Sequence, residues 1–161
     1  MAANLTPEKA LIFRITHVSN VSWILENGLH CPNGERDPNF EPIGNPDIIA
    51  QRKDPEVVIY PFGVLSDYIP FYFTPYSPML LNIKTGYRPE VIKRDNADIV
   101  ILVSSLYKVR EYGVPFVFTD RHAVAASALV RFSSNFEDLP DWIPWDLLQA
   151  VDFRRDPERP D

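Results

Sequence analysis

The sequence predicts a single domain of the α+β class. Its 161 residues suit one domain of the usual ~100 to 200 residues. Hydrophobic residues make up 45% and charged residues 24%, which is typical of a globular chain with a core. Strand-like and helix-like segments do not alternate regularly along the chain, so a doubly wound parallel sheet is disfavoured and a smaller β core with flanking helices and long loops is expected.

The N-terminal quarter predicts a strand, a short turn and a helix. Ala10–Thr16 (ALIFRIT) is short and rich in β-formers, as a buried strand is. Ser19 or Asn20 can cap the following helix, and Gly28 can end it in a left-handed conformation. Residues Cys31–Pro46 then hold too many prolines and polar turn residues for a helix or a strand, so we expect a long loop.

The middle of the chain predicts short elements separated by prolines. Asp47–Lys53 is expected to form a helical turn that carries Arg52 out of the long loop, and Val57–Tyr60 is a short β-prone run. Pro70–Thr74 (PFYFT) is interpreted as a strand. A helix from Met79 towards Lys84 follows, with a proline in its first turn.

The C-terminal part begins with the clearest strand signal, Asp98–Ser104 (DIVILVS). A short helix is expected to follow and to stop before Gly113, and Val114–Thr119 predicts another strand. Ala123–Val130 has a helical pattern, while Leu139–Val151 is expected to be a helical or irregular packing segment rich in aromatic residues.

Composition and charge exclude several classes of protein. No apolar stretch approaches a membrane span and no signal peptide is visible, so we expect a cytoplasmic protein without a membrane partner. The single cysteine excludes an intramolecular disulfide, and three histidines without paired ligand spacing argue against a metal site. Net charge is -6, yet residues 84–131 carry eight basic and five acidic residues, which leaves a basic nucleic-acid-binding face open.

Two candidate site segments lie in the first third of the chain. Arg14, Thr16 and His17 stand at a strand-to-helix junction, where free backbone N–H groups can bind an anionic ligand or simply be capped. Arg52 follows a long loop and suits a phosphate contact, although an ordinary surface cation is the alternative. A thiol nucleophile at Cys31 is disfavoured because no partner would orient a base beside it.

Two further segments combine aromatic and polar residues. In residues 70–80, exposed rings can stack on bases, but strand alternation places Phe71 and Phe73 on one face and Tyr72 on the other, so about half should be buried in the core. The segment from Phe116 ends in His122, which can meet a substrate base or cap the chain locally.

Taken together, the strings RITH, GVLSDYIPFYFTPYSPML, VPFVFTDRHA and DFRRDP, with Arg52 in the loop between the first two, resemble the DarT family over residues 11–157. That family consists of bacterial toxins that use NAD to ADP-ribosylate thymidine in single-stranded DNA and are paired with the DarG macrodomain antitoxin. The resemblance implies an ADP-ribosyltransferase fold with a split β core around NAD.

The resemblance also implies roles for individual residues. Residues 35–53 would close over NAD, and Arg52 would be catalytic as well as NAD-binding. The remaining NAD-binding residues would be Arg14, Ile15, Thr16, His17 and Asn20, and those facing the target nucleotide would be Tyr72, Tyr76, Met79 and His122.

One part of the family pattern is not found. The catalytic glutamate of the family follows the DFRRDP-like stretch in an A-E pair, and Glu158 has the wrong neighbours for that role. The expectation is a single domain over residues 1–161 that is truncated at its C-terminus and weakly active or inactive. The alternatives are a silent NAD- or nucleic-acid-binding module and an ADP-ribosyltransferase acting on RNA or protein.

Overall fold

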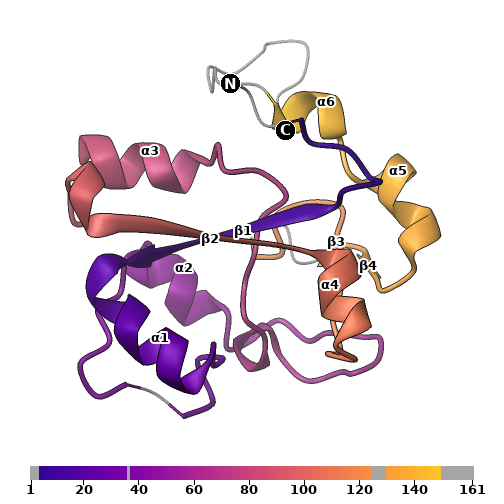
Figure 1. The fold of residues 1–161 in the computed structure, drawn as a ribbon, viewed down its shortest axis with the longest axis horizontal. Helices are drawn as coiled ribbons and strands as arrows, with labels where there is room; N and C mark the ends of the chain where they lie inside the picture. Colours follow the sequence, from indigo (N-terminus) through magenta and orange to yellow (C-terminus); the bar gives the residue numbers. More distant parts are fainter. Residues whose placement is uncertain (1–3, 36, 125–129, 150–161) are drawn as a thin grey trace.

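The computed structural model describes residues 4–35, 37–124 and 130–149. Its centre is an antiparallel pair of strands, β1 (Leu11–His17) and β2 (Ile99–Ser105), which crosses the molecule in Figure 1. The register places Leu11 opposite Ser105 and His17 opposite Ile99. Both strands are rich in Ile, Leu and Val, so the two strongest strand predictions are confirmed.

The segment 70–74 lies along the other edge of β1, but it pairs through one bridge only. Phe13 and Tyr72 exchange both backbone hydrogen bonds, at 2.8 and 2.9 Å between N and O. Pro70, which would lie opposite Ile15 in a longer ladder, has no N–H to donate, so the ladder cannot extend on that side. The prediction of a full strand here was therefore wrong, although its position beside β1 is strand-like.

Four short helices surround the strands, and polar residues begin three of them. The helices are α1 (Val21–Asn27), α2 (Pro46–Gln51), α3 (Pro78–Thr85) and α4 (Leu106–Glu111). The side chains of Asn45, Ser77 and Ser105 accept hydrogen bonds from first-turn N–H groups of α2, α3 and α4. In Figure 1, α3 lies above the strand pair, and α1 and α2 lie below it.

The C-terminal part is more broken than the sequence predicts. The strand expected over Val114–Thr119 is reduced to β3 (Phe118–Thr119), paired with β4 (Phe132–Ser133). Of the segment predicted over Leu139–Val151, residues 139–149 form the one-turn helices α5 (Leu139–Trp142) and α6 (Trp145–Leu148), because Pro144 holds Ile143 in an extended conformation between them. Residues 150 and 151 lie outside the described residues.

The predictions for two other segments, Val57–Tyr60 and Ala123–Val130, had different outcomes. Val57–Tyr60 is not a strand, since the nearest pairing is an isolated bridge between Glu56 and Val64. The helix predicted over Ala123–Val130 falls mostly on residues 125–129, which lie outside the described residues.

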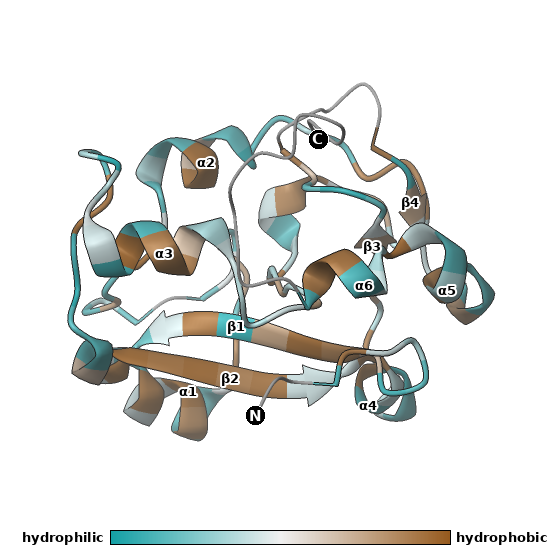
Figure 2. Cartoon of the chain, turned by 90° about the horizontal axis from the view of Figure 1, so that it is seen from above, coloured by the Kyte–Doolittle hydropathy of each residue, from teal (hydrophilic) through white to brown (hydrophobic). Residues whose placement is uncertain are grey.

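Two hydrophobic clusters hold these elements together. The larger joins β1 to α4, α5 and α6 through residues such as Phe13, Leu139 and Trp145, with Phe71 and Phe73 packed against it as predicted. The smaller joins Ile15 to Ile83 of α3. Figure 2 shows the resulting hydrophobic stripe along both strands. Within the described ranges, no helix has the length and apolar character needed to cross a membrane.

Candidate functional site

A cavity with a volume of about 1000 Å³ lies beside β1 in the described structure. Its wall is built from β1, the loop that follows α1, the end of α2, residues 61–74, α4, the segment around β3, β4 and the region of α5 and α6. Arg52, Tyr72 and His122, which were predicted from widely separated segments, all line it. The fold therefore brings the catalytic candidate together with two of the four nucleotide-facing candidates.

Arg52 is held by main-chain carbonyl groups. It is the residue at which α2 ends, and its Nη2 donates hydrogen bonds to the carbonyl oxygens of Leu65, at 2.5 Å, and Tyr68, at 3.1 Å. Its buried Nε has no hydrogen-bond partner within the described residues. Burial lowers the pKa of the guanidinium, because removal from water disfavours the charged form.

Arg14 lies behind the cavity wall, on β1. Its Nη1 donates to the carbonyl oxygen of Pro70 at 3.0 Å, and its Nε is likewise buried without a partner among the described residues. Burial, and then the positive charge of Arg52, lower the pKa of Arg14 to about 10. The two arginines are therefore close enough to repel each other, and both stay charged at neutral pH.

Tyr72 and His122 form the aromatic side of the cavity. Their ring centroids are 6.5 Å apart. Burial raises the pKa of Tyr72, although Arg52 and Arg14 act in the opposite direction, so the phenol is neutral at pH 7. Burial and the charge of Arg52 lower the pKa of His122, and its Nδ1 accepts a hydrogen bond from the N–H of Val124 at 3.3 Å.

The wall of the cavity holds two basic residues, Arg52 and Arg121, and two acidic residues, Asp67 and Asp120. In the described structure, neither Arg14 nor Arg52 has a carboxylate within ion-pair distance. The acidic residues of the wall are engaged elsewhere: Asp67 accepts from the Val64 N–H and Asn33, and Asp120 pairs with arginines. A buried cation without a counter-ion favours an anionic ligand such as a phosphate.

The other four candidates on β1 and the turn after it do not line this cavity. Ile15 packs into the smaller hydrophobic cluster, and His17 Nδ1 accepts from the Ser19 N–H at 3.2 Å. Thr16 and Asn20 are buried, and the Asn20 amide donates to Thr16 Oγ1 at 3.2 Å. These four residues surround the C-terminal end of β1 and do not contact the cavity.

Asn20 also anchors the long loop. Its amide nitrogen donates to the Glu41 carbonyl oxygen at 2.8 Å, and its Oδ1 accepts from the Glu41 N–H at 2.9 Å. The Glu41 carboxylate in turn pairs with Arg94. Asn20 therefore acts on the loop expected to cover NAD, through backbone contacts.

Tyr76 and Met79 also lie outside the cavity wall. The backbone N–H of Tyr76 donates to Thr74 Oγ1 at 3.0 Å. Met79 packs against the smaller hydrophobic cluster, close to Gly44 of the long loop.

Sequence reasoning missed the groups that orient Arg52. The carbonyl oxygens of Leu65 and Tyr68 belong to the main chain, which every residue has, so no residue pattern marks them. Among the residues that the structure describes, no cluster of three or more His, Cys, Asp or Glu side chains is arranged to hold a metal ion.

Comparison with known proteins identifies relatives over almost the whole chain. Residues 13–161 match the family model described as ssDNA thymidine ADP-ribosyltransferase, DarT. A DNA ADP-ribosyl transferase of Escherichia coli O127:H6 is 49% identical over 160 residues, which cover 99% of this chain and 72% of that protein. One from Thermus aquaticus is 41% identical over 89% of this chain and 63% of its own length.

Solved structures show the same arrangement. Thermus sp. 2.9 DarT in complex with ADP-ribosylated ssDNA superposes with a TM-score of 0.83 at 37% identity, covering 98% of this chain and 73% of that one. The same protein in complex with NAD+ gives a TM-score of 0.77 at 38% identity, covering 94% and 70%. The predicted α+β class is confirmed by this similarity.

Proposed function

The chain belongs to the DarT family of single-stranded DNA thymidine ADP-ribosyltransferases, and from this premise we propose that it uses NAD to ADP-ribosylate thymidine bases. The proposal rests on one observation above all. Arg52 enters a cavity of about 1000 Å³ with its charge uncompensated by any described carboxylate. A dinucleotide carries the anionic phosphates that such a cavity favours.

The transfer has two steps, and the charge of Arg52 suits the second. The bond between nicotinamide and the ribose C1′ breaks with its electron pair leaving on nicotinamide, and the ribose gains oxocarbenium character. Thymine N3 then bonds to C1′ and gives up its proton to solvent water. Arg52 favours loss of that proton electrostatically, since a fixed cation stabilises the anionic base. Arginine keeps its own proton throughout.

His122 and Tyr72 contribute as neutral groups. Because the pKa of His122 is lowered, its imidazole adds no further positive charge near the oxocarbenium at neutral pH. Tyr72 offers a ring on which a base can stack, as proposed for the nucleotide-facing set with Tyr76 and Met79. A single-stranded substrate avoids the cost of unstacking and unpairing the base.

The roles proposed around NAD divide into two kinds. Arg52 touches the ligand in the cavity. The end of β1 is formed by Arg14, Ile15, Thr16 and His17. Asn20 holds the loop that is expected to cover NAD, through its hydrogen bonds to Glu41.

A carboxylate for the oxocarbenium is also needed. Asp67 and Asp120, the acids of the described wall, are already bonded within the chain. We infer that another carboxylate supplies this role. This inference is tested by comparing two chains, this one and one lengthened by the A-E segment of the family. Each chain is incubated with labelled NAD and a single-stranded oligonucleotide that contains thymidine. Label transfer only by the longer chain is the expected result, and equal transfer by both contradicts the inference.

The central experiment substitutes Arg52. Arg52→Lys keeps the charge but cannot donate to two carbonyl oxygens in one plane, so we expect NAD affinity to fall by about tenfold, or about 1.4 kcal/mol. Calorimetry with NAD measures it without requiring turnover. Arg88→Ala is the matched control, because this exposed arginine makes only a 4.0 Å pair with Glu90. Unchanged NAD affinity in Arg52→Lys would refute the role of Arg52.

The acceptor and the biological role are tested separately. Single-stranded DNA, RNA and protein acceptors are offered with labelled NAD to the lengthened chain, and label on thymidine-containing DNA alone is expected. As a toxin paired with a DarG-like macrodomain antitoxin, the lengthened protein should arrest growth of a bacterial host. Co-expression of a macrodomain that removes ADP-ribose should restore growth, and arrest that persists would argue against that pairing.

A further inference from the structure

A second, smaller hollow adjoins the Arg52 cavity. It has a volume of about 610 Å³, and residues 114–116 line both it and the larger cavity. Tyr60 stands at one side of the hollow and Arg110 of α4 at another. The shared wall makes the hollow the direct neighbour of the larger cavity on this side of the molecule.

Aromatic rings make up much of this hollow. Phe116 and Phe136 meet edge to face, with centroids 5.5 Å apart. Tyr60 is 69% exposed and packs edge-on against Phe62, which is 57% exposed and lines the Arg52 cavity. Tyr60 and Phe62 are two positions apart in the chain, and each lines one of the two cavities. Such solvent-exposed rings resemble the stacking platforms that bind single strands.

Arg110 supplies a preorganised cation. Its guanidinium carbon lies 4.1 Å from the centroid of Phe136 and 5.4 Å from that of Tyr107. No described carboxylate forms an ion pair with it, although Glu137 lines the same hollow. The contact with Phe136 leaves the N–H donors of the guanidinium without a carboxylate partner among the described residues, and such donors suit a phosphate. Glu137 offers an acceptor for an amino group of a base.

We propose that this hollow is a second nucleotide subsite, which binds the neighbour of the target thymidine in the same strand. The base stacks on Tyr60 and Phe116, and Arg110 contacts the phosphate between the two nucleotides. This inference rests on the proposed function for its choice of nucleic acid, but its test does not depend on transfer.

The test asks whether the contribution of the neighbouring base to binding depends on the Tyr60 ring. A labelled single-stranded pentanucleotide with a central thymidine is titrated by fluorescence anisotropy, together with versions carrying an abasic site on either side. One abasic version should bind the parent chain about fivefold or more weakly. In Tyr60→Ala this penalty should disappear. Tyr87→Ala is the matched control, because Tyr87 is 80% exposed and lies outside both cavities.

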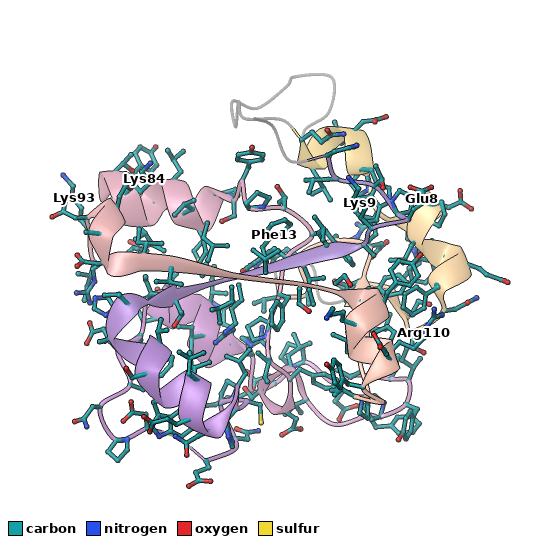
Figure 3. The ribbon with its side chains drawn as sticks, in the orientation of Figure 1. Glu8, Lys9, Phe13, Lys84, Lys93 and Arg110 are labelled. Atoms are coloured by element: carbon teal, nitrogen blue, oxygen red, sulfur yellow. The ribbon has the colours of Figure 1, made fainter. Side chains whose placement is uncertain are left out.

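Arg110 is tested through salt. Arg110→Ala should lower the slope of log Kd against log salt by about 0.7, the contribution of one phosphate contact on a single strand. Tyr60→Ala should leave that slope unchanged. Lys84→Ala is the control, since Figure 3 shows Lys84 and Arg110 at opposite ends of the molecule.

The outcomes separate this inference from the proposed function. An abasic penalty that persists in Tyr60→Ala overturns the subsite even if thymidine is ADP-ribosylated, and leaves the hollow to a protein partner. A penalty that vanishes in Tyr60→Ala supports the subsite even if no transfer is found. Failure of the parent chain to bind any of the oligonucleotides overturns both.

Discussion

Asn20 is the residue whose replacement tests the architecture of the site most directly. Only 1% of it is exposed, and its amide makes three hydrogen bonds, to Thr16 Oγ1 and to the carbonyl and N–H of Glu41. The partners at Glu41 lie 21 residues away, in the loop expected to cover NAD. In Asn20→Ala both backbone groups of Glu41 lose their partner in a part-buried place.

The magnitude follows from the number of groups left unpaired. Each unsatisfied buried polar group costs about 1 to 3 kcal/mol, so two groups, partly relieved by loop movement, give about 3 kcal/mol. For a chain of this length, 1 kcal/mol corresponds to about 2 to 4 °C in Tm. Asn20→Ala should therefore lower the Tm by about 6 to 12 °C.

Thermal unfolding followed by circular dichroism measures this loss. Asn27→Ala is the matched control, because the exposed Asn27 amide donates only to the Trp23 carbonyl within α1. That variant should change the Tm by no more than about 2 °C. Calorimetry should also show weaker NAD binding by Asn20→Ala. Equal Tm values for the two variants would refute the anchoring role of Asn20.

Two further substitutions test the cavity wall. Burial raises the pKa of Asp120, but hydrogen bonds from Arg131 and Arg121 outweigh it and leave the pKa lowered. Its stabilisation is therefore full above the unfolded pKa near 3.9 and is lost as the pH falls through the folded value. Asp120→Asn should unfold more readily in urea at pH 7, with a difference from the parent that shrinks below about pH 4; a constant difference would contradict this. Gly63→Ala should lower the Tm more than Gly28→Ala, because both glycines have positive φ but only at Gly63 would a Cβ lie 2.6 Å from Asp67 Oδ2; equal losses would contradict it.

Elements with local causes were predictable from the sequence. β1 and β2 carry continuous β-forming residues, and the cap at Ser77 and the left-handed Gly86 delimit α3 where expected. The prediction of a strand over residues 70–74 failed because the composition is strand-like but Pro70 cannot donate a hydrogen bond to a ladder. Strand propensity describes residues one at a time, whereas the pairing of a strand depends on backbone hydrogen bonds with the neighbouring strand.

Three of the ten candidate site residues line the cavity, and the roles of all ten stay predictions. Arg52, Tyr72 and His122 were identified from separate segments, and the fold places all three around one cavity. The anchoring of Glu41 by Asn20 was not foreseen, since it depends on a contact between residues far apart in the chain. Such contacts have no signature in local spacing.

The way the arginines are held explains why their charge remains available. A carboxylate would orient a guanidinium and also neutralise it, whereas a carbonyl oxygen orients it and leaves the net charge in place. Arg52 is oriented by Leu65 and Tyr68, and Arg14 by Pro70, so each keeps its full charge in a partly desolvated setting. Attraction to an anion is strongest where water is excluded. The folded chain therefore keeps two like charges close together at a cost in stability, and an anionic ligand in the cavity offsets that cost.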